Sequence, residues 1–137
     1  MAFDPQRFVQ AQMTVYDDVV AELRRGRKVS HWMWFVFPQL AGLGRSATAQ
    51  YYALDDLEAA RDYVAHELLG SRLVECSGLL TSLPGGDPVA VFGAVDAQKL
   101  QSSMTLFSLA ASHEPVFRAV LDKYFAGRPD VGTTSRV

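Results

Sequence analysis

The sequence predicts an all-α fold: a single domain built as an irregular bundle of about five or six helices. Apolar residues recur at three- and four-residue steps along most of the chain, and no stretch alternates with the period of two that a strand needs. The chain has 137 residues, of which 49% are hydrophobic and 20% charged. This length and composition indicate one globular domain and exclude a disordered chain.

The first predicted helix covers residues 5–25. Asp4 is suited to cap it, Pro5 fits its first position, and Gly26 can end it in a left-handed conformation. We expect this helix to be scaffold, because one apolar stripe runs along it, made of Phe8, Val9, Met13, Tyr16, Val20 and Leu23.

A second helical region is predicted over residues 54–83. Asp55 and Glu58 have the spacing of a capping box, and the apolar pattern continues through His66, whose position before a helical run predicts a capping role. Gly70 lowers the helix propensity, but nothing in the region has the period of a strand.

Shorter helices complete the predicted bundle. A turn rich in proline and glycine precedes a short helix that begins with Asp87 and ends at Gly93. Asp96 is expected to cap the next helix, and His113 has a position like that of His66, just before the last helix. That last helix is expected to end at Gly127.

The predicted domain spans residues 1–127, and residues 128–137 are expected to form a flexible tail because they lack apolar periodicity. The most apolar run, residues 32–37, is far shorter than the roughly 20 residues of a membrane helix. The net charge of −2 predicts no nucleic-acid partner. A single cysteine, Cys76, can form no internal disulfide, and no secretory segment is recognisable, so we expect a cytoplasmic protein with no membrane partner.

Residues 24–46 differ from the rest of the chain. Both tryptophans, Trp32 and Trp34, lie here among other aromatic residues, with basic residues on either side and two glycines near the end. Such a segment suits a nucleotide-like ligand, because rings stack on a base, guanidinium groups bind phosphate and glycines let backbone N–H groups approach an anion. The alternative is that the same aromatic residues pack in the core.

Other reactive groups give weaker signals. Cys76 lies on an apolar stripe, where burial is expected and a reactive thiolate is not. No metal site is predicted, because His31, His66 and His113 are far apart and show none of the spacings of metal ligands. No cofactor is predicted.

The stretch SHWMWFVFPQLAGLGRSATAQYYAL closely resembles a bacterial family of unknown function, domain of unknown function 1810, and the resemblance extends over nearly the whole chain. It implies an all-helical domain and no established activity. Members of this family have often been labelled calpastatin. Calpain inhibitors of that type are long, polar and disordered, whereas this chain is compact and apolar, so we do not expect a calpain inhibitor.

A fainter resemblance concerns the NAD- and ADP-ribose-associated domain, whose members cleave N-glycosidic bonds or recognise ADP-ribose derivatives. RFVQAQ near the start and the K…M…L…F pattern near the end are similar to it, and the resemblance places Gln12, Lys99 and Met104 at its motif positions. The chain departs from that pattern where the domain carries a Glu-His pair, because Gln6 and Arg7 stand there.

Two functions therefore stay open. The first is binding of a nucleotide-derived small molecule related to NAD or ADP-ribose, with or without hydrolysis of an N-glycosidic bond by a carboxylate such as Asp17, Asp18 or Glu22. The second is a non-enzymatic interaction or structural module whose aromatic segment is core. For the first, the predicted ligand-binding residues are Gln12, His31, Trp32, Trp34, Arg45 and Lys99.

Overall fold

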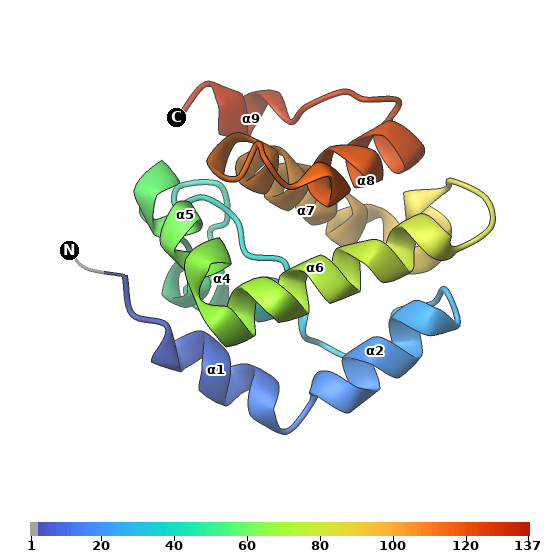
Figure 1. The fold of residues 1–137 in the computed structure, drawn as a ribbon, viewed down its shortest axis with the longest axis horizontal. Helices are drawn as coiled ribbons and strands as arrows, with labels where there is room; N and C mark the ends of the chain where they lie inside the picture. Colours follow the sequence, from blue (N-terminus) through green and yellow to red (C-terminus); the bar gives the residue numbers. More distant parts are fainter. Residues whose placement is uncertain (1–2) are drawn as a thin grey trace.

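The structure is a computed structural model that describes residues 3–137. Within them the chain is helical and contains no strand, as the sequence predicts (Figure 1). The helices are α1 (Gln6–Met13), α2 (Tyr16–Arg24), α3 (Met33–Val36), α4 (Ala47–Tyr52), α5 (Leu57–Ala65), α6 (Glu67–Ser82), α7 (Pro88–Ala110), α8 (Pro115–Phe125) and α9 (Val131–Thr134).

The nine helices of the described residues exceed the five or six predicted. The difference arises because the first predicted helix is divided, and because α3, α4 and α9 have only four, six and four residues. Helices this short are too brief to show a periodic pattern in the sequence.

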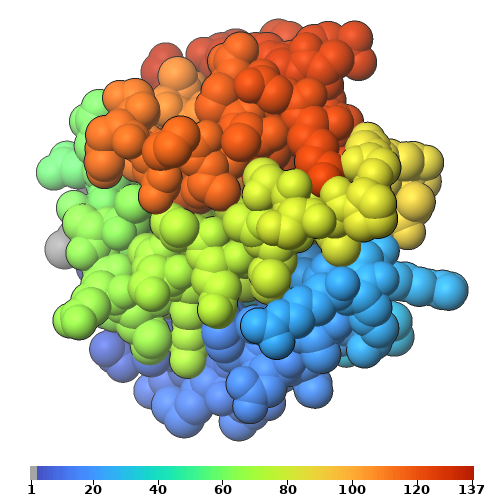
Figure 2. Space-filling view, turned by 45° about the vertical axis from the view of Figure 1, so that its right-hand side comes forward, coloured from blue at the N-terminus to red at the C-terminus, as the bar shows by residue number. Residues whose placement is uncertain are grey.

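Helix α6 lies at the centre of the bundle. It contacts α2 on one side and α5 and α8 on the others, while α7 contacts α5, α8 and α9. Figure 2 shows the yellow-green α6 crossing the surface between the blue N-terminal helices and the orange and red C-terminal part. The molecule is therefore a set of helices packed around α6 and α7.

The first predicted helix is divided at Thr14 and Val15. Val15 has φ −120° and ψ −7°, which are outside the helical range. The division lets α1 pack mainly on α3, and also on α6, while α2 packs on α6. Of the predicted stripe, Phe8 and Leu23 are fully buried, whereas Met13 is 65% exposed; Val19, which is not on that stripe, is also fully buried.

The caps differ in detail from those predicted. Asp56, and not Asp55, caps α5 by accepting from the backbone N–H of Ala59 at 2.8 Å. His66 caps α6 as predicted, because its Nδ1 accepts from the backbone N–H of Leu69 at 3.2 Å. The cap of α8 is Glu114, so the prediction for His113 is wrong.

Two glycines explain where helices meet or bend. A Cβ at position 70 would lie 2.0 Å from the carbonyl oxygen of Val64, so Gly70 permits the close approach of α5 and α6. Gly93 has φ 79° and interrupts α7, at the end predicted for the short helix that Asp87 caps. Asp96, expected to cap the following helix, instead pairs with Lys28 and Lys99.

The C-terminal residues, expected to be a flexible tail, contain α9, which packs on α7. Thr133 of α9 is fully buried. The contacts that hold α9 are polar, and for that reason the apolar pattern of the sequence does not indicate them.

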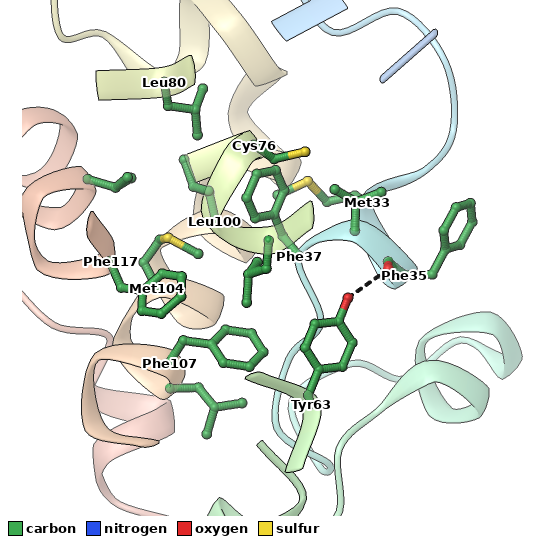
Figure 3. Packing of buried hydrophobic residues seen from close by; sticks show 14 of the residues in the cluster. Met33, Phe35, Phe37, Tyr63, Cys76, Leu80, Leu100, Met104, Phe107 and Phe117 are labelled. Atoms are coloured by element: carbon green, nitrogen blue, oxygen red, sulfur yellow. Dashed lines mark hydrogen bonds between the residues drawn. The ribbon is translucent and has the colours of Figure 1, made fainter. Parts of the chain in front are cut away.

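The core contains most of the aromatic segment. Trp32 and Phe37 are 1% and 0% exposed, and Figure 3 shows Met33, Phe35 and Phe37 among side chains of α5, α6, α7 and α8. The hydroxyl of Tyr63 donates to the carbonyl oxygen of Phe35 at 3.3 Å. No helix in the described part of the chain is both long enough and apolar enough to span a bilayer.

Candidate functional site

A cleft of about 340 Å³ lies between three parts of the chain that are far apart in sequence: the loop before α4, one face of α7, and α9. This volume is at the lower end of the range for small-molecule sites, about 300–1,000 Å³. The lining combines charged, amide and hydroxyl groups with glycines and two apolar side chains. Its residues are Gln39, Leu43, Gly44, Val95, Gln98, Lys99, Ser102, Asp130 and Gly132.

The loop that forms one wall is fixed by backbone hydrogen bonds and by close packing. The N–H of Leu54 donates to the carbonyl of Gln39 at 2.9 Å, and the N–H of Ala41 donates to the carbonyl of Leu54 at 2.8 Å. A Cβ at Gly44 would lie 2.5 Å from the Cβ of Ala49 on α4, so only glycine fits there. The wall is therefore formed before any ligand arrives.

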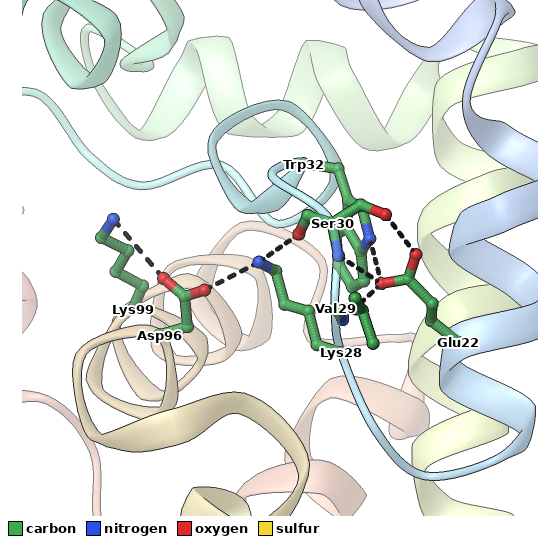
Figure 4. A network of polar contacts seen from close by, with 7 residues as sticks. All are labelled: Glu22, Lys28, Val29, Ser30, Trp32, Asp96 and Lys99. Carbon is green, nitrogen blue, oxygen red and sulfur yellow. Dashed lines mark hydrogen bonds and ion pairs between the residues drawn. The ribbon is translucent and has the colours of Figure 1, made fainter.

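Asp96 lies between two lysines beside the cleft (Figure 4). Its Oδ2 is 2.9 Å from Nζ of Lys28, and its Oδ1 is 3.6 Å from Nζ of Lys99. The side chain of Lys28 is only 7% exposed, and its Nζ also donates to the carbonyl of Ser30 at 2.6 Å. Two ammonium groups thus share one carboxylate. Lys28 is held more closely, so Lys99 has the weaker ion pair of the two.

Lys99 also contacts an aromatic ring, that of Trp34, which is not itself among the residues that line the cleft. Its Nζ lies 5.0 Å from the centroid of the Trp34 ring, within the distance of a cation–π interaction. The Lys99 side chain keeps 23% of its surface exposed, and Trp34 is half-buried. A cation that lines the cleft and a partly accessible aromatic ring therefore lie side by side.

The wall between α7 and α9 is a chain of hydroxyl and carboxylate groups. Asp130 caps α9, because its Oδ2 accepts from the backbone N–H of Thr133 at 3.0 Å and from the Thr133 hydroxyl at 2.7 Å. Oγ1 of Thr133 is 3.1 Å from Oγ of Ser102. The backbone N–H of Asp130 donates to Oγ1 of Thr105 at 2.9 Å, which ties α9 to α7 a second time.

Glu22 anchors the segment that leads into the cleft. Its Oε1 accepts from the backbone N–H groups of Val29 and Ser30 at 2.6 and 2.9 Å and from Nε1 of Trp32 at 3.0 Å, and its Oε2 accepts from the Ser30 hydroxyl at 2.6 Å. Burial alone would raise the pKa of Glu22. The hydrogen bonds, led by that of the Ser30 hydroxyl, outweigh burial and hold the pKa at about 2, below its ordinary value of 4.5.

Two of the predicted site residues lie in the interior. Gln12 is 1% exposed; its Nε2 donates to the carbonyl of Phe35 at 2.7 Å and to the Tyr63 hydroxyl at 3.1 Å, while its Oε1 accepts from Arg72 at 3.3 Å. Trp32 is 1% exposed, and its ring N–H is bound to Glu22. Partners within the protein satisfy both side chains, so neither presents a surface to the cleft.

The other two, His31 and Arg45, are exposed at the surface. Arg45 directly follows Gly44 of the cleft lining, and its backbone carbonyl accepts from the Gln50 amide at 3.0 Å. The structure thus brings Lys99 and Trp34 into contact. Neither Arg45, which follows the lining residue Gly44 in sequence, nor His31 is among the residues that line the cleft.

Several lining residues were missed from the sequence, above all Gln39, Ser102 and Asp130. The spacing of Asp130 and Thr133 is that of a helix cap and its third residue, a signal that could have revealed α9. Ser102 carries no such signal, because a hydroxyl on a helix is ordinary until a second element is placed against it.

Neither the Cys76 thiol nor a metal cluster provides a second site among residues 3–137. Burial raises the pKa of the Cys76 thiol to about 12, which keeps the thiol protonated and structural. Among residues 3–137 no three His, Cys, Asp or Glu side chains are placed to hold a metal ion.

The fold and the cleft define a small all-helical domain with a preformed polar cavity beside its aromatic core. The chain belongs to the family described as "Protein of unknown function (DUF1810)", which matches residues 2–137. The crystal structure of the conserved hypothetical protein Rv1873 from Mycobacterium tuberculosis is similar to it, with a TM-score of 0.97 and 50% sequence identity over 98% of this chain and 96% of that one. No curated protein matches the sequence.

Proposed function

We propose that this protein binds a small anionic molecule derived from a nucleotide, related to NAD or ADP-ribose, in the cleft between the loop before α4, α7 and α9. The observation that carries the proposal is the weak ion pair of Lys99, which shares Asp96 with the more closely held Lys28 and lines the cleft. An ammonium group with donors to spare at a concave, preformed wall is suited to bind phosphate.

The surroundings of Lys99 support the same ligand class. The Trp34 ring beside Lys99 offers a partly accessible face for a flat group. The exposed guanidinium of Arg45, next to Gly44, adds a phosphate-binding fork at the loop. The resemblance to the NAD- and ADP-ribose-associated domain, in which Lys99 falls on a motif position, points to the same class.

Binding is favoured over hydrolysis of an N-glycosidic bond. Such a reaction needs a carboxylate beside the bond. Asp17 and Asp18 are exposed on α2, and both oxygens of Glu22 are held by the residues 29–32 segment. Asp130 is the carboxylate of the lining, and its Oδ2 caps α9. We therefore expect no release of nicotinamide from NAD, measured by chromatography after prolonged incubation.

Isothermal titration calorimetry with ADP-ribose and with NAD tests the proposal. Lys99→Gln removes the charge and is expected to weaken binding roughly 10- to 100-fold, because a hydrogen bond to a charged group contributes about 1.5–3 kcal/mol. The matched control is Arg61→Gln, which removes an exposed charge on α5, outside the cleft, and should bind like the wild type. Equal affinities of the two variants would remove Lys99 from the site.

The second candidate is a non-enzymatic interaction or structural module. The burial of Trp32, Phe35 and Phe37 favours the part of this alternative that assigns the aromatic segment to the core. A thermal-shift screen separates the two candidates, since saturation at a hundred times the dissociation constant stabilises a protein by about 2.7 kcal/mol. The absence of any shift across a panel of nucleotides would leave the interaction module as the better explanation.

A further inference from the structure

The polar wall between α7 and α9 has a fixed hydrogen-bond direction. The Thr133 hydroxyl has one proton, and it donates that proton to Oδ2 of Asp130 at 2.7 Å. The contact of 3.1 Å between the Thr133 and Ser102 hydroxyls can therefore have only one donor, which is Ser102. The protons of both hydroxyls point along the chain from Ser102 to Thr133 to Asp130.

This direction determines what the wall offers a ligand. Because Oγ of Ser102 donates its proton to Thr133, it offers only lone pairs to a ligand. Ser102 lines the cleft and is 2% exposed. Oδ1 of Asp130 also lines this side and has no hydrogen-bond partner among residues 3–137. Both groups can only accept, so the ligand atoms that meet them must be donors.

The opposite requirement holds one turn earlier on α7. Lys99 and Ser102 are three residues apart, which places their side chains on the same face with Cβ atoms about 5–6 Å apart. The ammonium group of Lys99 can only donate, and its ion pair with Asp96, at 3.6 Å, leaves donors free. On this face of α7, the ligand group that binds Lys99 must therefore be an anionic acceptor, and the ligand group that binds Ser102 must be a neutral donor.

We propose that the part of the ligand held in this cleft is a sugar phosphate, with the phosphate at Lys99 and sugar hydroxyls donating to Ser102 and Asp130. This proposal rests on the proposed function. A phosphate alone offers these two acceptors no donor and brings negative charge toward the partly exposed carboxylate of Asp130. A sugar alone leaves the charge of Lys99 unmatched. A phosphate next to a hydroxyl-bearing ring satisfies both ends of the wall.

The test compares three small probes on the unmodified protein by calorimetry: ribose 5-phosphate, methyl phosphate and ribose. We expect ribose 5-phosphate to bind at least tenfold more tightly than either of the others, because only it satisfies both Lys99 and Ser102. Equal affinity of ribose 5-phosphate and methyl phosphate would overturn the sugar-phosphate assignment.

Two serine variants locate the effect. Ser102→Ala should weaken ribose 5-phosphate about tenfold and leave methyl phosphate unchanged, because it removes the acceptor for a hydroxyl and keeps Lys99. Ser103→Ala is the matched control: Oγ of Ser103 is buried and has no partner in the part of the chain that the structure describes, and Ser103 does not line the cleft. Thermal melting of both variants reports whether α9 stays in place.

The outcomes separate the two proposals. If ADP-ribose binds in a Lys99-dependent way but Ser102→Ala loses nothing for ribose 5-phosphate, the nucleotide proposal stands and the sugar-phosphate assignment is wrong. If ribose 5-phosphate binds with the expected dependence on Ser102 while ADP-ribose and NAD do not bind, the assignment stands and the nucleotide proposal is wrong. No binding of any of these probes contradicts both.

Discussion

Glu22 shows how one buried carboxylate can order a segment without a cation in contact. Four hydrogen bonds from Val29, Ser30 and Trp32 hold the backbone that leads to the cleft. We expect Glu22→Gln to lower the free energy of unfolding by about 1–3 kcal/mol, because the donors it leaves are buried. Asp18→Asn, an exposed change on the same helix, should stay within about 0.5 kcal/mol of the wild type.

The pH dependence of stability follows from the same residue. The pKa of Glu22 is depressed to about 2 from an ordinary value of 4.5, so its contribution is complete above pH 4.5 and is lost as the pH falls toward 2. Urea unfolding at a series of pH values should show a loss of stability in this window that Glu22→Gln lacks. Identical pH profiles of the two proteins would contradict the role given to Glu22.

A substitution of Arg45 distinguishes an effect on ligand binding from an effect on stability. Its side chain is exposed and has no ion pair in the part of the chain that the structure describes. Arg45→Ala should therefore change the free energy of unfolding by less than about 0.5 kcal/mol while weakening ADP-ribose binding by about 1.5–3 kcal/mol. Chemical denaturation and calorimetry on this variant measure both, and a large loss of stability would show that Arg45 holds the loop instead.

At the scale of elements, α9 completes the cleft and adds little to the core. It is attached through Ser102, Thr105 and the Gln101 amide, which donates to the carbonyl of Arg128 at 3.0 Å, and the buried apolar core has no member after Tyr124. Ending the chain after Gly127 should preserve the helical circular-dichroism spectrum and a cooperative melt but abolish ligand binding. Retained affinity in the shortened protein would exclude α9 as a wall of the site.

The sequence predicts those elements whose signals are local. The cap at His66, the break at Gly93 and the end of α8 near Gly127 each follow from one residue and its neighbours. The division at Val15 is not predictable in this way, because it depends on how α1 packs on α3 and how α2 packs on α6. The cleft cannot be predicted from the sequence either, because Gln39, Ser102 and Asp130 come together only when the loop, α7 and α9 pack against one another.

At the scale of the molecule, the aromatic segment is divided between two roles. Trp32 and Phe37 stabilise the interior, whereas the loop beginning at Gln39 lines the cleft and Trp34 contacts Lys99 of its lining. Composition alone marks the segment as unusual, but it cannot assign each ring to core or site, because that depends on the helix packed behind it. We therefore expect the aromatic core to stay intact when residues of the cleft are changed.

Mapping of backbone amide shifts in ¹H–¹⁵N NMR spectra during titration with ADP-ribose tests the location of the site most directly. The largest changes should fall on Gly44, Lys99, Ser102 and Gly132, which come from the three walls of the cleft. They should be absent from the hollow beside the N-terminal end of α7, lined by Gly26 and Gly85 among others. Changes centred on that second hollow, or no changes at saturating ligand, would contradict the proposed site.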